Sequence, residues 1–214
     1  MEPALSKGFI LIKKSGKEPG DMQYAYSFAH DQIQKAAAAL TPVVEISALH
    51  VHIGRILKKE LSEAQLDDAI FDIIDHLNHG IDPHGHILDG LDKEELIHLN
   101  LMAGKKAKAN AAWAPGFDYL HIALTLLEEN SWEKAYKLTL DIYNEIAEAA
   151  YLCGKYADLS IFAHAVFKNA ITLIDKERAY IAMIRAYTAE ANLIDAVKIG
   201  IQALAEYGVK FPKP

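Results

Sequence analysis

The sequence lacks two features that would assign it to a simple class of protein. It contains one cysteine among 214 residues, which excludes an internal disulfide. That residue, Cys153, lies in the apolar stretch EAAYLCGKY, where a buried structural thiol is expected rather than a nucleophile. No apolar run approaches the ~18 residues that a membrane-spanning helix needs, and the first apolar run, FILI, is short and followed by lysines, unlike a signal peptide. We therefore expect a cytoplasmic protein with no membrane partner.

Clustered positive charge is also scarce. Lys and Arg number 22 against 29 Asp and Glu, and the formal net charge is −7. A nucleic-acid surface usually requires a clustered basic face, and the basic residues here are scattered. The densest group, Lys105, Lys106 and Lys108, is expected to form a solvated face of a helix. We expect no nucleic-acid partner.

Complete catalytic motifs are missing as well. The strings SGKE and CGKY lack the upstream glycine and the Ser or Thr of a phosphate-binding loop. Neither a G-x-S-x-G elbow nor a dinucleotide-binding fingerprint is present. The sequence therefore predicts no catalytic residues and no cofactor for this chain itself.

Histidine is the abundant chemically active residue, with ten copies. His50 and His52 form H-x-H, but on a helix their side chains point about 200° apart and cannot chelate one ion. The other histidine-rich stretch is the loop NHGIDPHGHILDG, which has neither a cysteine pair nor an H-E-x-x-H helix nearby. We predict surface histidines and no metal site.

The pair His30-Asp31 admits two interpretations. It could belong to a metal-dependent phosphohydrolase of the His-Asp type, which would need further His and Asp ligands from other helices, and no recognisable spacing supplies them. Alternatively, Asp31 is the N-cap of the helix QIQKAAAAL that follows it.

The first forty residues predict a β-hairpin followed by a helix. The segment QYAYSFA alternates aromatic and small residues, which is the strand period. Before it, SGKEPGD supplies a cluster of turn-forming residues after the apolar run GFILIKK. We expect the hairpin near residues 8 to 29.

From Leu40 onward the pattern is helical. Thr41 is expected to cap a helix that has Pro42 at its first position. Ser62 with Gln65 has the spacing of a capping box, as does Asp92 with Glu95. We expect antiparallel helices across most of residues 31 to 207.

Part of this region is a degenerate repeat. Three stretches align, ANAAWAPGFDYLHIAL, LCGKYADLSIFAHAVF and AEANLIDAVKIGIQAL, each with an apolar anchor at a turn between two helices: Trp113, Tyr156 and Leu193. The anchors are separated by 43 and 37 residues, which is close to the tetratricopeptide (TPR) period of ~34. Small or apolar residues recur three, seven and ten positions after each anchor. We expect Trp113 and Tyr156 to be largely buried.

Several strings together resemble a known family. YAYSFAHDQIQKAA, LHVHIGRIL, IFDIIDHLNHG and LNLMAGKKAKANAAW occur in that order. They are similar to the region after the nucleotide-binding core of STAND-type predicted ATPases, which are often fused to Ser/Thr kinase, GAF and histidine kinase modules.

The resemblance implies a mainly α fold with two domains. Residues 1–40 would be a winged-helix tail, consisting of the hairpin and a helix, and residues 41–214 a TPR-like solenoid of antiparallel helix pairs. An upstream domain in cis would bind ATP or ADP with Mg²⁺. Ala29-His30-Asp31 matches two of three positions of the family's Met-His-Asp motif, whose histidine reaches the β-phosphate of ADP.

The expected function is therefore a non-catalytic regulatory module of a signalling ATPase coupled to a histidine or Ser/Thr kinase. A protein partner or signal ligand would bind the concave helical face. Two alternatives stay open, the metal-dependent phosphohydrolase and a standalone TPR-type adaptor.

Overall fold

The computed structural model describes residues 2–15, 23–59, 61–82 and 84–209. The described residues form eleven helices and one two-stranded sheet, which confirms the predicted mainly α fold with an N-terminal hairpin. The chain divides into two compact units, residues 1–50 and 51–214. This division falls inside helix α3 (Val43–Lys58), whereas the boundary expected from the sequence follows residue 40. That domain boundary stays a prediction.

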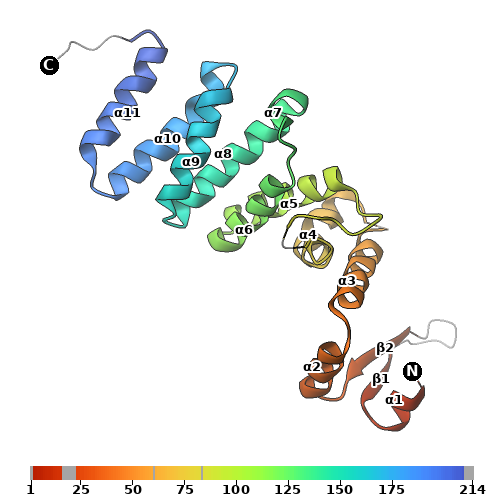
Figure 1. Cartoon of the computed structure of the whole chain (residues 1–214). Coiled ribbons are helices and arrows are strands. Elements are labelled where there is room, and N and C mark those ends of the chain that lie inside the picture. Colours follow the sequence, from red (N-terminus) through yellow and green to blue (C-terminus); the bar gives the residue numbers. More distant parts are fainter. Residues whose placement is uncertain (1, 16–22, 60, 83, 210–214) are drawn as a thin grey trace. The chain divides into compact units, whose positions relative to one another are not determined.

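The first unit contains the hairpin (Figure 1). After the short helix α1 (Glu2–Ser6), strands β1 (Ile10–Ser15) and β2 (Gln23–Phe28) pair antiparallel, with Ile10 opposite Phe28. The expected turn-forming cluster covers residues 15–21, of which Ser15 ends β1 and residues 16–21 lie outside the described residues. Helix α2 (Asp31–Leu40) follows β2.

The junction between α2 and α3 differs from the expectation. Thr41 ends α2 instead of capping α3, because its hydroxyl donates to the Ala37 carbonyl at 2.9 Å. Pro42 occupies the cap position of α3, since its carbonyl accepts the Ile46 N–H at 3.1 Å. Proline suits this place because no intrahelical bond requires its missing N–H.

Two predicted helix starts are confirmed in the second unit. Helix α4 (Glu63–Asn78) opens with a capping box. The Ser62 hydroxyl oxygen accepts the Gln65 N–H, and the side-chain oxygen of Gln65 accepts the Ser62 N–H. Helix α5 (Lys93–Ala109) opens with Asp92, whose carboxylate accepts the Glu95 N–H at 2.9 Å.

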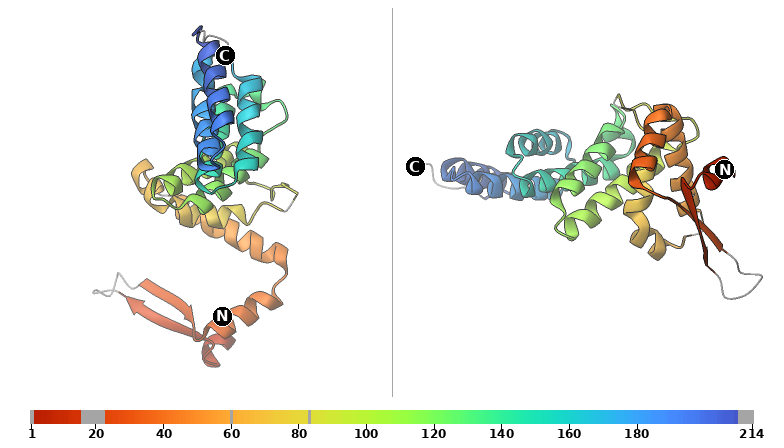
Figure 2. Two further views of the ribbon diagram at one scale, coloured as in Figure 1. Left: turned by 90° about the vertical axis from the view of Figure 1, so that its left-hand side faces the viewer. Right: turned by 90° about the horizontal axis from the view of Figure 1, so that it is seen from below.

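Helices α5 to α11 form three successive pairs, as Figures 1 and 2 show. The first helices of the pairs are α5, α8 (Tyr136–Leu152) and α10 (Leu173–Ala189), and the second helices are α6 (Trp113–Thr125), α9 (Tyr156–Asn169) and α11 (Leu193–Glu206). The short helix α7 (Ser131–Lys134) connects the first pair to the second. Within each pair the helices pack together, and α6 packs on α8 as α9 packs on α10. This order is that of a helical repeat.

The turn inside each pair has the same geometry. Its central residue has a positive φ, which is 59° at Ala111, 70° at Gly154 and 59° at Ala191. The next N–H donates to a carbonyl five residues back at 2.8–2.9 Å, as in a Schellman C-cap. In all three turns the helix that follows begins two residues later, at the predicted anchor. The repeat alignment therefore locates the helix starts correctly.

Small residues bring the helices of the first pair close together. A Cβ atom built on Gly104 of α5 would lie 2.5 Å from Cγ of Leu120, and one built on Gly116 would lie 3.2 Å from the Gly104 carbonyl oxygen. Only glycine fits such a contact without displacing a neighbour. Leu159 of α9 and Ala196 of α11 occupy the position that Gly116 has in α6, and both are also buried.

The core of the second unit runs through all three pairs and includes α4. Its main polar feature is a pair of amides: Asn100 of α5 is fully buried, and it exchanges two 2.9 Å hydrogen bonds with Asn78 of α4. Both amides are thereby satisfied, which a buried polar group requires.

Candidate functional site

His30 and Asp31 lie at the start of α2, and both side chains are exposed. The prediction that Asp31 caps this helix is wrong. His30 occupies the cap position with extended backbone, φ −147° and ψ 147°, and makes no side-chain capping bond, while Asp31 is the first helical residue. The helix begins one residue before the predicted start, because the His30 carbonyl accepts the Gln34 N–H at 3.3 Å. At this place the Asp31 carboxylate complements the positive end of the helix dipole.

The described side chains of the unit that carries His30 are all at least partly exposed. Among the described side chains of residues 1–50, none is buried. Large apolar side chains of the hairpin are exposed instead, namely Phe9, Leu11, Ile12, Tyr26 and Phe28. Both faces of the hairpin thus carry exposed apolar side chains, since Leu11 and Ile12 are neighbours on one strand.

The repeat anchors are less buried than expected. Trp113 is 44% exposed, Leu193 is exposed, and Tyr156 is partly buried. The predicted burial of Trp113 is therefore wrong. The reason is positional, because each anchor is the first residue of its helix and the residue three positions later faces the partner helix.

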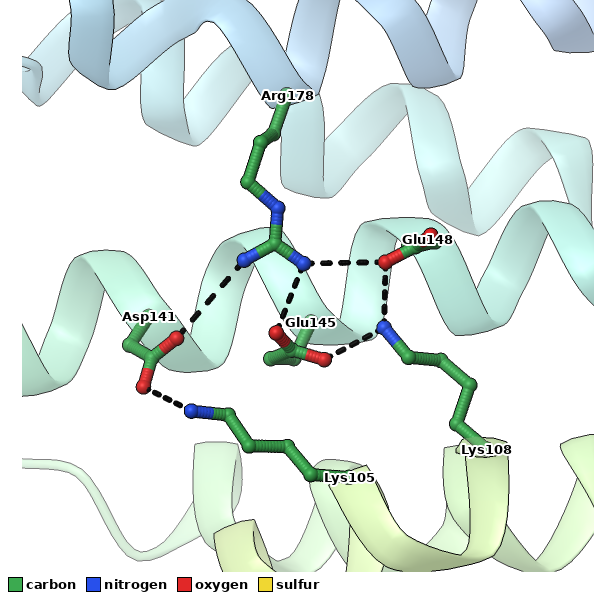
Figure 3. Close-up of polar contacts among 6 residues, drawn as sticks. All are labelled: Lys105, Lys108, Asp141, Glu145, Glu148 and Arg178. Atoms are coloured by element: carbon green, nitrogen blue, oxygen red, sulfur yellow. Dashed lines mark hydrogen bonds and ion pairs between the residues drawn. The ribbon is translucent and has the colours of Figure 1, made fainter. Parts of the chain in front are cut away.

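Charged side chains converge where the first helices of the three pairs meet (Figure 3). Lys108 of α5 lies 2.5 Å from both Glu145 and Glu148 of α8, and Arg178 of α10 lies 2.8 Å from Glu145 and 3.0 Å from Glu148. At the edge, Lys105 of α5 pairs with Asp141 of α8 at 2.5 Å. We call these six residues the charge cluster.

The centre of the charge cluster is shielded from water. Glu145 is 7% exposed, and the side chain of Lys108 is 13% exposed. Burial by itself would raise the pKa of the Glu145 carboxyl, but hydrogen bonds and charges from Lys108 and Arg178 outweigh it, so the net shift of that pKa is downward. The pKa of Glu148 is lowered by the same balance. Both carboxylates are therefore ionised at neutral pH.

The three lysines of α5 do not form the solvated face that the sequence predicted. Lys105 and Lys108 belong to the charge cluster, and Lys106 pairs with Asp67 of α4 at 3.1 Å. Sequence reasoning missed the cluster, although Asp141, Glu145 and Glu148 follow a helical spacing of four and three that places acids on one face.

A pocket of about 160 Å³ adjoins the charge cluster between α8 and α10. Its lining residues are Glu148, Tyr151, Arg178, Ile181, Ala182 and Arg185. Arg185 is exposed there. The pocket combines cationic, apolar and aromatic side chains, a mixture that suits contact with a peptide.

Groups with metal or nucleophile chemistry are sparse in the part of the chain that the structure describes. Within it, no three His, Cys, Asp or Glu side chains are placed to hold one ion. In the histidine-rich loop, His86 pairs with Asp82 at 2.9 Å. Burial raises the pKa of the half-buried Cys153 thiol, which disfavours the reactive thiolate.

No single described helix is both long and apolar enough to cross a bilayer, and α2 with α3 would reach that length only across a bend of 117°.

The fold and charge cluster define an α-helical repeat protein with an N-terminal hairpin. The chain is similar to the hybrid signal transduction histidine kinase G of Dictyostelium discoideum, at 26% identity over 208 residues. The match covers 86% of this chain but only 6% of the kinase, so the chain corresponds to a small part of that protein. No family model matches the chain, and no solved structure matches it. The similarity associates the chain with signal-transduction kinases.

Proposed function

We propose that the chain is a non-catalytic regulatory and protein-interaction module of a signal-transduction ATPase of the STAND type, coupled to a histidine or Ser/Thr kinase. The observation that supports the link to a signalling kinase is the similarity of most of the chain to a small part of a hybrid histidine kinase, and the link to a STAND ATPase rests on the resemblance of the sequence strings given above.

The first unit supports a role as the tail of a winged-helix domain. Its hairpin and α2 follow one another as such a tail would, and their apolar side chains are exposed. An upstream nucleotide-binding domain in cis would cover them. His30 is exposed at the end of the hairpin, where it could donate a hydrogen bond to the β-phosphate of ADP in that domain.

The second unit supports a role in partner recognition. Repeats of helix pairs build extended binding surfaces, and the charge cluster holds three successive first helices together. The pocket beside the charge cluster offers Arg185 and Ile181 to a partner. Partner binding would then shift the nucleotide state of the ATPase, provided the partner prefers one state.

The test uses a longer protein that includes the residues encoded upstream of this chain. We expect His30→Ala to speed ADP release and to raise basal kinase output, because a lost hydrogen bond to a charged group costs ~1.5–3 kcal/mol. Asp31→Asn, which keeps the helix start, serves as the matched control for local structure. Unchanged ADP release and unchanged output would contradict the nucleotide role.

Two further results would contradict the proposal as a whole. The 214-residue chain, purified without a histidine tag, should contain no stoichiometric metal ion and should hydrolyse no phosphoesters; a bound ion with hydrolysis would favour the phosphohydrolase. If the upstream reading frame encodes no nucleotide-binding domain, the standalone adaptor is favoured instead.

A further inference from the structure

The pocket between α8 and α10 contains a positive charge that no acid of the described chain balances. The α10 residues that line it lie three or four positions apart and share one face of the helix; they are Arg178, Ile181, Ala182 and Arg185. The guanidinium of Arg178 already pairs with Glu145 and Glu148. Arg185 is exposed, and within the described residues it has neither an ion pair nor a hydrogen bond.

The other charges at the pocket are neutralised within the charge cluster (Figure 3). The charge cluster contains three cations and three acids, and all six pair with one another. Glu148, the acid that lines the pocket, lies 2.5 Å from Lys108 and 3.0 Å from Arg178. An anion that enters the pocket therefore meets Arg185 as the unbalanced charge. Because the net charge of the chain is −7, a long polyanion would be repelled elsewhere, whereas a single acidic side chain is attracted here.

An apolar contact lies one helical turn from Arg185. Ile181 is 40% exposed, and its neighbour Ala182 is buried. From α8, the partly buried Tyr151 adds an aromatic side chain to the lining. An exposed aliphatic side chain beside an unpaired guanidinium favours a ligand that carries an apolar group close to a carboxylate.

The size and spacing of the pocket suit an extended peptide. Its volume of about 160 Å³ is below the ~300–1,000 Å³ of sites that enclose a small molecule, so it accommodates a side chain rather than a cofactor. Residues four apart on a helix, such as Ile181 and Arg185, are separated by a rise of ~6 Å. Residues two apart on an extended strand point to the same side and are ~6–7 Å apart. One peptide can therefore contact both side chains.

We infer that this pocket binds an extended segment of a partner protein in which Asp or Glu lies two positions from an aliphatic residue. The guanidinium of Arg185 donates to the carboxylate, and the aliphatic side chain packs on Ile181. A phosphorylated residue is a poorer ligand, because its charge of about −2 would need a second free cation and Arg178 is already paired. The inference rests on the proposed role of the second unit in partner recognition and does not involve the nucleotide switch.

The first experiment measures peptide binding to the 214-residue chain by fluorescence anisotropy. The labelled probe contains Leu-Ser-Glu-Ser-Leu between capped Gly-Ser ends, so that its spacing reads the same in both directions, and a second peptide carries Gln in place of Glu. We expect the Glu peptide to bind roughly ten- to hundred-fold more tightly, because the Gln peptide lacks the charge-assisted hydrogen bond. Equal affinities, or no binding of the Glu peptide up to about 2 mM, overturn the inference.

Variants of the chain then locate the carboxylate. Arg185→Gln should abolish the preference for the Glu peptide over the Gln peptide. Arg185→Glu should reverse it, so that a peptide with Lys in place of Glu binds more tightly than the Glu peptide. Ile181→Ser should weaken both the Glu and the Gln peptide by the same factor, because it removes only the apolar contact. A preference that survives Arg185→Gln contradicts the inference.

The control variant separates Arg185 from the overall charge of the chain. Lys168→Gln on α9 removes one exposed positive charge outside the pocket and should leave the preference for the Glu peptide unchanged. All variants should keep the melting temperature of the unmodified chain, because every substituted side chain is exposed. A preference that Lys168→Gln abolishes would mean that net charge attracts the peptide, and it would overturn the inference.

A third peptide tests the class of acid. A peptide with phosphoserine in place of Glu should bind less tightly than the Glu peptide, and tighter binding would overturn the inference in favour of phosphopeptide recognition. These binding tests and the ADP-release test of His30→Ala use different readouts and different proteins. The peptide preference and the proposed nucleotide role can therefore fail separately.

Discussion

The Nζ of Lys108 lies 2.5 Å from a carboxylate oxygen of Glu145, and the two residues come from helices of different pairs, α5 and α8. Arg178 of α10 holds the other oxygen of the same carboxylate at 2.8 Å. One buried acid is thus shared by three successive helix pairs, and the first prediction follows from its burial.

Glu145→Gln should destabilise the chain by about 2–4 kcal/mol. The substitution removes the charge that Lys108 and Arg178 share and leaves two cations close together in a shielded place, and breaking a buried ion pair costs ~3–5 kcal/mol. The control is Glu128→Gln, because the pair of Glu128 with Lys134 is well exposed and its loss should change the free energy of unfolding far less. Urea unfolding of both variants measures the difference. An equal decrease in the free energy of unfolding for both variants would contradict a special role for Glu145.

The charge cluster should also make stability depend on acid pH. The pKa of Glu145 is lower in the folded state than the unfolded value of ~4.3. Its contribution is therefore fully present above that unfolded pKa and is lost as the pH falls through the lower, folded pKa. The unmodified chain should lose stability below about pH 4.5 more steeply than Glu145→Gln does. Urea midpoints measured between pH 7 and pH 3 test this, and parallel curves would argue against it.

Exchanging alanine and glycine at the turns inside the helix pairs should change stability in opposite directions. Ala111 and Ala191 adopt a left-handed backbone, which costs an L-residue roughly 1–2 kcal/mol. Ala111→Gly should therefore raise stability by about 0.5–1 kcal/mol after the larger unfolded-state entropy of glycine is subtracted. Gly154→Ala, in the equivalent turn, should lower stability by about 1 kcal/mol. Thermal melts of the two variants suffice, and shifts of the same sign would refute the equivalence of the turns.

Two aromatic residues of α6 should differ in their effect on stability. Phe117→Ala should cost about 3–5 kcal/mol because the ring is buried. Trp113→Ala, four residues earlier, should cost clearly less, since almost half of its side chain stays in water. Denaturant unfolding of the pair tests this order. A larger loss for Trp113→Ala would mean that its ring packs more tightly than its exposure indicates.

Local signals in the sequence predicted the elements well, because capping and turn chemistry act over a few residues. The alternating run before His30 specifies β2, and Ser62 with Gln65 specifies the start of α4. The repeat alignment located the first residues of α6, α9 and α11 for the same reason. Each of these signals lies within one turn or one helix.

The charge cluster could not be predicted in this way, because it depends on contacts between residues that are distant in the sequence. Lys108 and Glu145 are 37 residues apart in the chain, and no local pattern indicates that they meet. Two other errors are local: Trp113 is the first residue of α6, where the residue three positions later faces the partner helix, and α2 has its cap at His30, one residue before Asp31. The nucleotide contact of His30 stays a prediction, since it concerns a domain outside this chain.

The paired amides of Asn78 and Asn100 have a consequence for how α4 can move. Their two hydrogen bonds favour one axial position of α4 on α5, since sliding by one residue would break both while Asn100 stays fully buried. The amide pair therefore holds α4 and α5 in one relative position. A displacement of α4 along its axis should consequently move α5 with it.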